Sequence, residues 1–178
     1  MNWTLESRGG KTVVRLVNSG FTTGGADWEN EWFDSTSYGW LFMLTNLRHS
    51  LERHPGEPRE VAWPRRKATG TREAAYQKLL ASGGLFTEGF PSEYGEGQKY
   101  SLRSTTGEIF SGRIEFVAPP RGFCVSVEQL NDALLWLTIE GAPGNLDVQL
   151  WLSAYGEQSS DVKVFEDRSG AQLERILS

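Results

Sequence analysis

Residues 12–21 read TVVRLVNSGF, and this stretch with its two flanks decides the fold class. Apolar and polar side chains in its first half form two alternating sets, which is typical of a β-strand with two different faces. Trp3 and Leu5 lie on the other side of Gly9-Gly10, and a Gly-Gly pair supplies the positive φ angles that tight hairpin turns require. Residues 2–18 are therefore predicted to form a β-hairpin.

After the hairpin, the pattern changes to that of one long helix from Asp27 to about Arg53. Apolar positions recur at spacings of three and four and form one stripe, made of Thr36, Trp40, Met43, Leu44, Leu47 and Leu51. Gly39 inside the helix costs about 1 kcal/mol relative to Ala, a cost that close approach to a sheet or a ligand would offset. Pro55-Gly56 ends the helix.

The rest of the chain has the pattern of an antiparallel sheet with shorter helices. A strand at 59–68 contains Pro64, which favours the edge of a sheet, and a short helix at 71–82 precedes a loop at 83–97. Turn-forming residues then separate five predicted strands at 98–104, 109–117, 122–130, 133–141 and 146–155. A closing helix at 159–177 is supported by Leu173, Ile176 and Leu177 and weakened by Gly170. The predicted fold class is α+β.

One internal similarity links the beginning of the chain to its end. The stretch Trp3-Thr4-Leu5-Glu6, with a glycine turn and Thr12-Val13 after it, recurs loosely as Leu137-Thr138-Ile139-Glu140, a Gly/Pro turn and Asp147-Val148. Each copy is a hairpin that leads toward a helix. Chance similarity between two hairpins is the competing interpretation.

The run from Thr12 to Phe21, together with Trp28, the pair Gly39-Trp40 and the leucines that follow, resembles a known family. It is similar to the last strand and the long C-terminal helix of the START-like (helix-grip, SRPBCC) superfamily, in the group related to activators of the heat-shock chaperone ATPase. The resemblance covers residues 1–54. It implies a curved antiparallel sheet around a long helix, with a cavity between them. The family order is strand, short helices, sheet and long helix.

This chain departs from the family order, because the final hairpin and long helix come first. Two explanations stay open. Residues 59–155 supply the missing parts in a permuted helix-grip fold, or residues 1–54 are the truncated end of one START-like unit and residues 55–178 form a second. We expect residues 1–54 and 55–178 to pack as one body, since a lone hairpin and striped helix would expose a large apolar patch. If residues 1–54 are instead the end of a separate unit, a homodimer would bury that patch.

The composition excludes several classes of protein. Eighteen basic and 23 acidic side chains give a net charge of −5, which disfavours a nucleic-acid partner. Cys124 is the one cysteine, so no intrachain disulfide forms and a reducing compartment is expected. No stretch has the apolar length of a membrane span, and no secretion signal is visible. We expect a soluble, cytoplasmic protein.

The sequence contains no catalytic or metal-binding motif, and no cofactor is predicted. His49 and His54 are five residues apart and share a helix face poorly, so no metal site is predicted from them. Nucleophile-elbow and nucleotide-binding glycine patterns are missing. No catalytic residue is assigned, and the chain is interpreted as a binding module rather than an enzyme.

The positive signal is a set of apolar and aromatic residues that a helix and a curved sheet would direct toward each other. The predicted ligand-binding residues are Trp40, Met43 and Leu47 from the helix, and Tyr100, Phe110, Phe123 and Trp136 from the sheet. The leading hypothesis is a binding or carrier protein for a small hydrophobic molecule. The alternatives are a protein-interaction module that assists a chaperone ATPase, and a cyclase- or hydrolase-type enzyme that would use Tyr100, Tyr155 or Glu128.

Overall fold

The computed structural model describes residues 1–21, 27–157 and 159–178, and these form two compact units, Met1–Thr36 and Ser37–Ser178. Helix α1 (Asp27–Arg53) begins in the first unit and contributes most of its length to the second. The predicted packing of residues 1–54 and 55–178 as one body stays a prediction.

The first unit contains the predicted hairpin, with β1 (Asn2–Arg8) antiparallel to β2 (Lys11–Val17). Gly9 and Gly10 both have positive φ angles, as the turn requires. Trp3 faces Leu16 across the strands and Leu5 faces Val14, so one face of the hairpin is apolar. In this unit, the ring of Phe21 also contacts the rings of Trp32 and Phe33 on α1.

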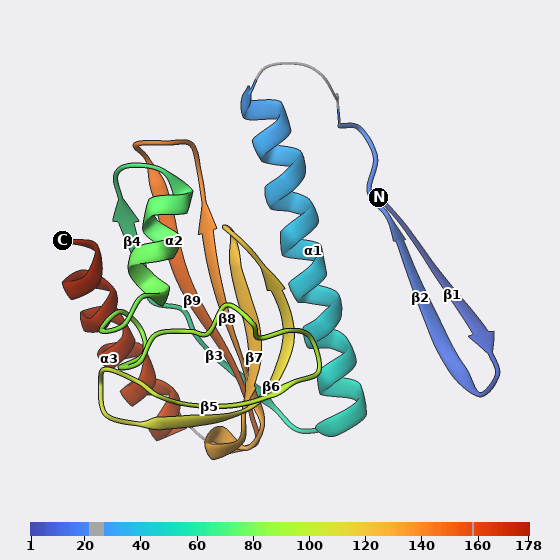
Figure 1. Cartoon of the computed structure of the whole chain (residues 1–178). Helices are drawn as coiled ribbons and strands as arrows, with labels where there is room; N and C mark the ends of the chain where they lie inside the picture. The colour runs from blue at the N-terminus through green and yellow to red at the C-terminus, as the bar shows by residue number, and fades with distance from the viewer. Residues whose placement is uncertain (22–26, 158) are drawn as a thin grey trace. The chain divides into compact units, whose positions relative to one another are not determined.

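The second unit is built on an antiparallel sheet with the strand order β3-β9-β8-β7-β6-β5, and β4 also pairs with β9 (Figure 1). Its strands are β3 (Arg59–Ala62), β4 (Arg65–Ala68), β5 (Lys99–Arg103), β6 (Ile109–Ala118), β7 (Gly122–Val127), β8 (Ala133–Glu140) and β9 (Leu146–Tyr155). Its shorter elements are α2 (Arg72–Leu80), the 3₁₀ turn η1 (Glu128–Leu130) and the closing helix α3 (Ser159–Leu177).

The elements agree with the sequence prediction except at Pro64 and Glu128. Residues 59–68 form two short strands, because Pro64 has no N–H to donate and interrupts the ladder between them. The Pro64 carbonyl instead accepts a hydrogen bond from the Leu150 N–H, at 3.1 Å. The strand predicted at 122–130 ends at Val127, since Glu128–Leu130 turn into η1. The predicted α+β class with a helix-grip arrangement is confirmed.

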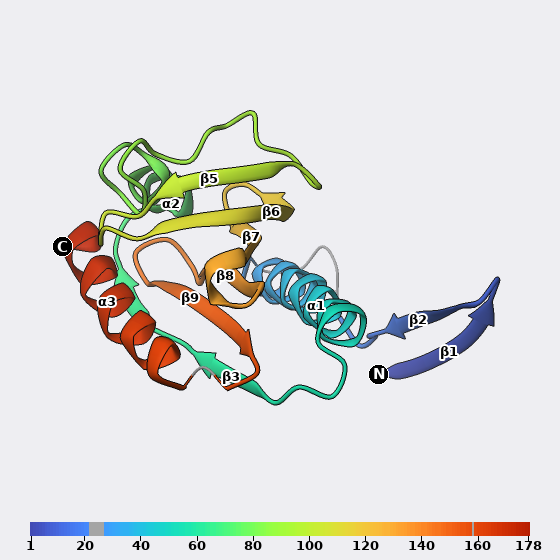
Figure 2. The ribbon, with the colours of Figure 1, turned by 90° about the horizontal axis from the view of Figure 1, so that it is seen from below.

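Strands β7 and β8 carry apolar side chains on both faces of the sheet. On β8, Leu135, Leu137 and Ile139 belong to the core under α2 and α3, while Leu134 and Trp136 belong to a second core on the opposite face. The second core includes Tyr38 and Phe42 of α1. Figure 2 shows the resulting layers, with α3 on one side of the sheet and α1 on the other.

The helix gripped by the sheet is α3 and not the predicted helix 27–53. Val162, Phe165 and Leu173 of α3 are buried in the larger core against the strands. Residues 59–177 thus run in the order strand, helix, sheet and closing helix. The hairpin forms a two-stranded sheet of its own within the first unit.

Helix α1 contacts the sheet with a different face from the one predicted. The side chains buried by this contact are Tyr38, Phe42, Asn46 and His49. The ring of Phe42 stacks on Trp136 at 4.2 Å between centroids, and the Tyr38 hydroxyl donates to the Leu137 carbonyl at 3.2 Å. The predicted stripe lies on the outer side, where Leu47 is 39% exposed and Leu51 is 66% exposed. Apolar residues lie on two faces of α1, and the helical spacing alone does not indicate which of the two faces contacts the sheet.

No helix among the described residues is both long and apolar enough to cross a membrane.

The two faces of α1 differ in what they contribute to stability. Phe42→Ala should lower the free energy of unfolding by about 3–5 kcal/mol, because it leaves a cavity beside Trp136. Leu47→Ala is the matched control and should cost less than about 1 kcal/mol, because its side chain is already half in water. Urea denaturation of both variants measures this, and equal losses would contradict the assigned orientation.

Candidate ligand site

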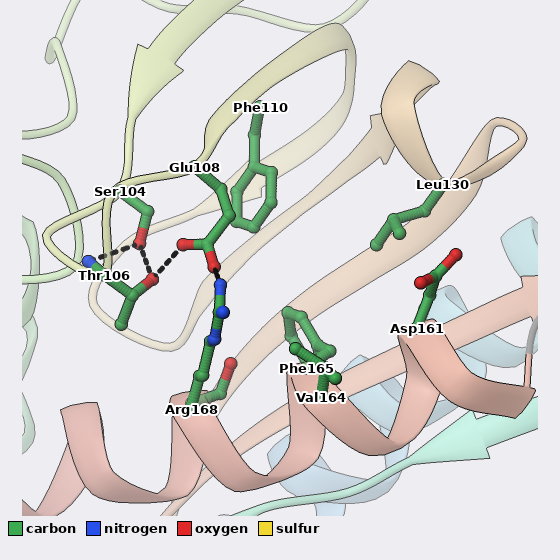
Figure 3. A pocket seen from close by; sticks show the side chains of 10 residues that line it. Ser104, Thr106, Glu108, Phe110, Leu130, Asp161, Val164, Phe165 and Arg168 are labelled. Atoms are coloured by element: carbon green, nitrogen blue, oxygen red, sulfur yellow. Dashed lines mark hydrogen bonds and ion pairs between the residues drawn. The ribbon is translucent and has the colours of Figure 1, made fainter.

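A pocket of about 220 Å³ lies between helix α3 and the β5–β6 side of the sheet (Figure 3). Its apolar wall is formed by Phe110 of β6, Leu130 of η1, and Val164 and Phe165 of α3. Its polar wall is formed by Ser104, Thr106, Glu108, Asp161, Arg168 and Ser169. The volume is below the ~300–1,000 Å³ of typical ligand pockets, so the site fits only a small molecule.

The polar wall is a connected network around Glu108. Arg168 of α3 forms an ion pair with the Glu108 carboxylate, and the Thr106 hydroxyl donates to the same carboxylate. The hydroxyls of Ser104 and Thr106 lie 2.7 Å apart. Burial acts to raise the pKa of Glu108, but hydrogen bonds from Thr106 and Arg168 outweigh it and lower the pKa below its ordinary value. Glu108 is therefore a carboxylate at neutral pH, suited to accept hydrogen bonds and not to donate a proton.

The interior below the pocket is filled by aromatic rings. Phe165 and Phe110 line both the pocket and a smaller hollow next to it, which Phe123 also lines and which measures only about 10 Å³. Phe123 stacks on Phe90 with centroids 4.6 Å apart. A ligand would thus occupy the rim between α3 and the sheet and would not enter the core.

Gln172 fixes α3 to the loops beside the pocket. Its side-chain amide donates to the Leu85 carbonyl at 2.8 Å and to the Thr105 hydroxyl at 2.7 Å. The side chain is almost fully buried, so these bonds carry most of its polar capacity. A second depression of about 300 Å³ lies beside the pocket and shares Thr106 and Arg168 with it.

The structure brings only part of the predicted site together. Phe110 lines the pocket, Phe123 lies just beneath it, and Tyr100 is buried in the same core, where its hydroxyl donates to the Ser126 carbonyl at 2.7 Å. Trp136 lies on the opposite face of the sheet. The helix candidates Trp40, Met43 and Leu47 belong to α1 and are not among the residues that line this pocket. Whether any of the seven binds a ligand stays a prediction.

The contribution of α3 to the pocket was not predicted from the sequence. The helical wall of the pocket consists of Val164, Phe165 and Arg168. These residues belong to the closing helix, whose sequence pattern is weakened by Gly170. The signal that existed was the spacing of Phe165, Leu173 and Ile176, which continues the apolar face toward Val162.

The residues considered for an enzyme are Tyr100, Tyr155 and Glu128, and each has a hydrogen-bond partner of its own. Burial raises the pKa of Tyr155 to about 12, and its hydroxyl donates to the Asn46 amide oxygen at 2.9 Å. Burial also raises the pKa of Tyr100 far above its ordinary value. Glu128 accepts a hydrogen bond from the Ser111 hydroxyl at 2.8 Å. Neither tyrosine is poised to exchange protons near neutral pH.

A separate cluster of possible metal ligands lies where α1 ends. His49, His54 and Asp132 offer ligand atoms that lie within 4.8 Å of one another. Burial lowers the pKa of His49, although the hydrogen bond to the Asp132 backbone opposes this effect.

The element order and the sheet that packs around α3 define a helix-grip arrangement. A solved structure similar to the chain is the Aha1 dimer from Colwellia psychrerythraea, with a TM-score of 0.54 and 14% identity over 66% of this chain and 93% of that chain. Protein SSP2350 from Staphylococcus saprophyticus matches with a TM-score of 0.53 and 11% identity over 66% and 89% of the two chains.

CalU16 from Micromonospora echinospora matches with a TM-score of 0.50 and 18% identity, over 68% of this chain and 75% of that chain. Identities this low establish the fold alone. Comparison with protein-family models gave no match, and comparison with the sequences of curated proteins gave none either.

The Glu108 network predicts a pH dependence of stability. The pKa of Glu108 is lower in the folded state than its ordinary value of 4.5. The ionised carboxylate therefore contributes to the free energy of unfolding above pH 4.5, and this contribution is lost as the pH falls through the folded-state pKa. Urea unfolding of the wild type should thus show a loss of stability below pH 4.5 that Glu108→Gln lacks. Arg168→Gln should reduce this loss, because the carboxylate loses its cation. Identical acid profiles for the wild type and Glu108→Gln would contradict this assignment.

Proposed function

We propose that the chain is a non-catalytic binding module for a small, mainly apolar molecule held at the rim between α3 and the sheet. The pocket in Figure 3 carries the proposal, because Phe110, Leu130 and Phe165 provide an apolar wall. Hydroxyls at Ser104 and Thr106 face it from the other side. Such a wall orients a compact ring that bears one hydroxyl or carbonyl group.

The charges of the site refine the class of ligand. Arg168 is already paired with Glu108, so the ligand meets a neutralised pair and not a free cation. A strongly anionic molecule would have to displace the carboxylate, while a neutral one keeps the pair intact. The proposal therefore favours neutral aromatic alcohols over fatty acids or phosphates.

Binding can be tested with 2-naphthol, which has an aromatic body and a single hydroxyl. At 100 times its dissociation constant it should stabilise the wild type by about 2.7 kcal/mol in thermal unfolding. Val164→Trp should remove this stabilisation because the indole occupies the pocket, and Val61→Trp is the matched control on β3, where Val61 is similarly exposed. Equal stabilisation of both variants, or saturable binding by neither the wild type nor the control, would refute the proposed site.

A protein-interaction function is the second candidate. The outer face of α1 in the Ser37–Ser178 unit exposes Leu41, Met43, Leu47 and Leu51, and an exposed apolar patch can mark a protein–protein interaction site. A similar solved structure is named as an Aha1 dimer. A partner such as a chaperone ATPase, or a second copy of this chain, would bury this face.

The two candidates predict different effects of one variant. Leu51→Glu should abolish any dimer seen by sedimentation equilibrium and any change in chaperone ATPase rate, while leaving 2-naphthol binding unchanged, because Leu51 is 66% exposed and is not among the residues that line the pocket. A wild-type chain that sediments as a monomer and leaves the ATPase rate unchanged would eliminate this candidate.

A further inference from the structure

The corner where α1 ends brings together the only two histidines of the chain. Helix α1 ends at Arg53, so His54 leaves the helical path and its ring comes within 5.3 Å of the His49 ring, measured between centroids. Both side chains are about 4% exposed. Asp132, in the turn between η1 and β8, completes a group whose ligand atoms lie within 4.8 Å.

We propose that His49, His54 and Asp132 bind one divalent transition-metal ion, of the zinc class, at this corner. Two imidazole nitrogens and one carboxylate oxygen are a donor set that zinc accepts, with a fourth position left for water. The site lies within the Ser37–Ser178 unit and is independent of the ligand pocket at α3.

The ring of His54 is prepared for coordination. Its Nδ1 lies 3.2 Å from the Glu57 carboxylate, while its Nε2 is buried and has no hydrogen-bond partner. A carboxylate on one ring nitrogen fixes the tautomer and leaves the lone pair on the other, which is the usual arrangement behind a metal-bound histidine. An unpartnered buried nitrogen is unfavourable in the apo protein, and a metal ion would satisfy it.

The orientation of the His54 ring is held from two sides. The ring stacks on Tyr155 with centroids 4.2 Å apart and an angle of 4° between the planes. Glu57 is itself fixed, because the Asn131 side-chain amide donates to the same carboxylate oxygen at 3.3 Å. His54 thus has little freedom to turn its Nε2 elsewhere.

His49 and Asp132 are adjacent but currently bonded to other groups. The Nε2 of His49 lies 2.6 Å from the Asp132 backbone carbonyl and 3.7 Å from its carboxylate. The carboxylate pairs with Arg53, which is 42% exposed and free to move into solvent. Tetrahedral zinc with bonds of about 2.0–2.1 Å holds its ligand atoms about 3.4 Å apart, so binding requires a closure of up to about 1.4 Å and release of Arg53. It also requires His49 to leave the Asp132 carbonyl and carry its proton on Nδ1, so that Nε2 offers a lone pair.

The primary experiment is a calorimetric titration of Zn²⁺ into the full chain after removal of metal with EDTA. We expect saturation at one ion per chain, and Co²⁺ should show the visible absorption of a low-coordinate nitrogen and oxygen site. His49→Gln and His54→Gln should each abolish saturation, and Glu57→Gln should weaken binding by about 10–100-fold because it orients His54. Asp167→Asn, on the exposed side of α3, is the matched control and should bind like the wild type.

Arg53→Gln separates a metal site from a structural hydrogen-bond network. It removes the cation that competes for Asp132, so Zn²⁺ affinity should rise above that of the wild type. Far-ultraviolet circular dichroism checks that each variant is folded. If a histidine variant does not fold, the Zn²⁺ affinities of Glu57→Gln and Arg53→Gln test the metal site instead. Absence of saturable binding to the wild type, or Arg53→Gln affinity no higher than wild type, would overturn the proposal.

Discussion

Strands β7 and β8 are apolar on both faces, and this constraint determines how the larger unit is built. Every residue of β7 and all of β8 up to Ile139 are buried. An antiparallel sheet that is wet on one side alternates polar and apolar residues, and these two central strands do not. The sheet must therefore be covered twice, and the chain provides α2 and α3 for one face and α1 for the other.

The double cover explains where the two candidate sites lie. The face under α3 is packed with Phe123, Phe86 and Phe90, and the pocket lies at the rim of the helix, beside Phe110. On the other face, Phe42 and Tyr38 hold α1 against Trp136, and the last turn of α1 reaches the η1–β8 turn. The position of His49 beside Asp132 is a consequence of that packing and not of any local motif.

The sequence predicted the elements well because each has a clear local signal. Gly9-Gly10 marks the hairpin turn, Pro55-Gly56 follows the end of α1, and the strands from Lys99 to Tyr155 appear close to their expected bounds. The partners of those elements were less predictable. Helix α1 has apolar residues on opposite sides, at Phe42 and at Leu47, and hydrophobic spacing alone does not say which side a sheet covers.

The candidate sites were harder to predict because they depend on contacts distant in sequence. Phe110 was predicted as a ligand-binding residue from the pattern of its strand. The residues that line the pocket with it, Val164 and Arg168, lie more than fifty positions away on a helix whose sequence pattern is weakened by Gly170. His49 and His54 are five residues apart, and residues at that spacing on a helix point in different directions. Their rings lie close together because α1 ends between them, and the ring of Tyr155 stacks on His54.

The two copies of the internal repeat have comparable strand registers. In the late copy, Leu137 faces Leu150 and Ile139 faces Val148, and these pairs form the core side of β8 and β9. In the early copy, Trp3 faces Leu16 and Leu5 faces Val14, and these apolar pairs have the same sequence separations as the pairs of the late copy. The late hairpin has further strands on both edges, whereas the early one forms a sheet of its own among the described residues. The hairpin thus repeats the strand register of β8 and β9 without their neighbouring strands, and the division of the chain into residues 1–54 and 55–178 stays a prediction.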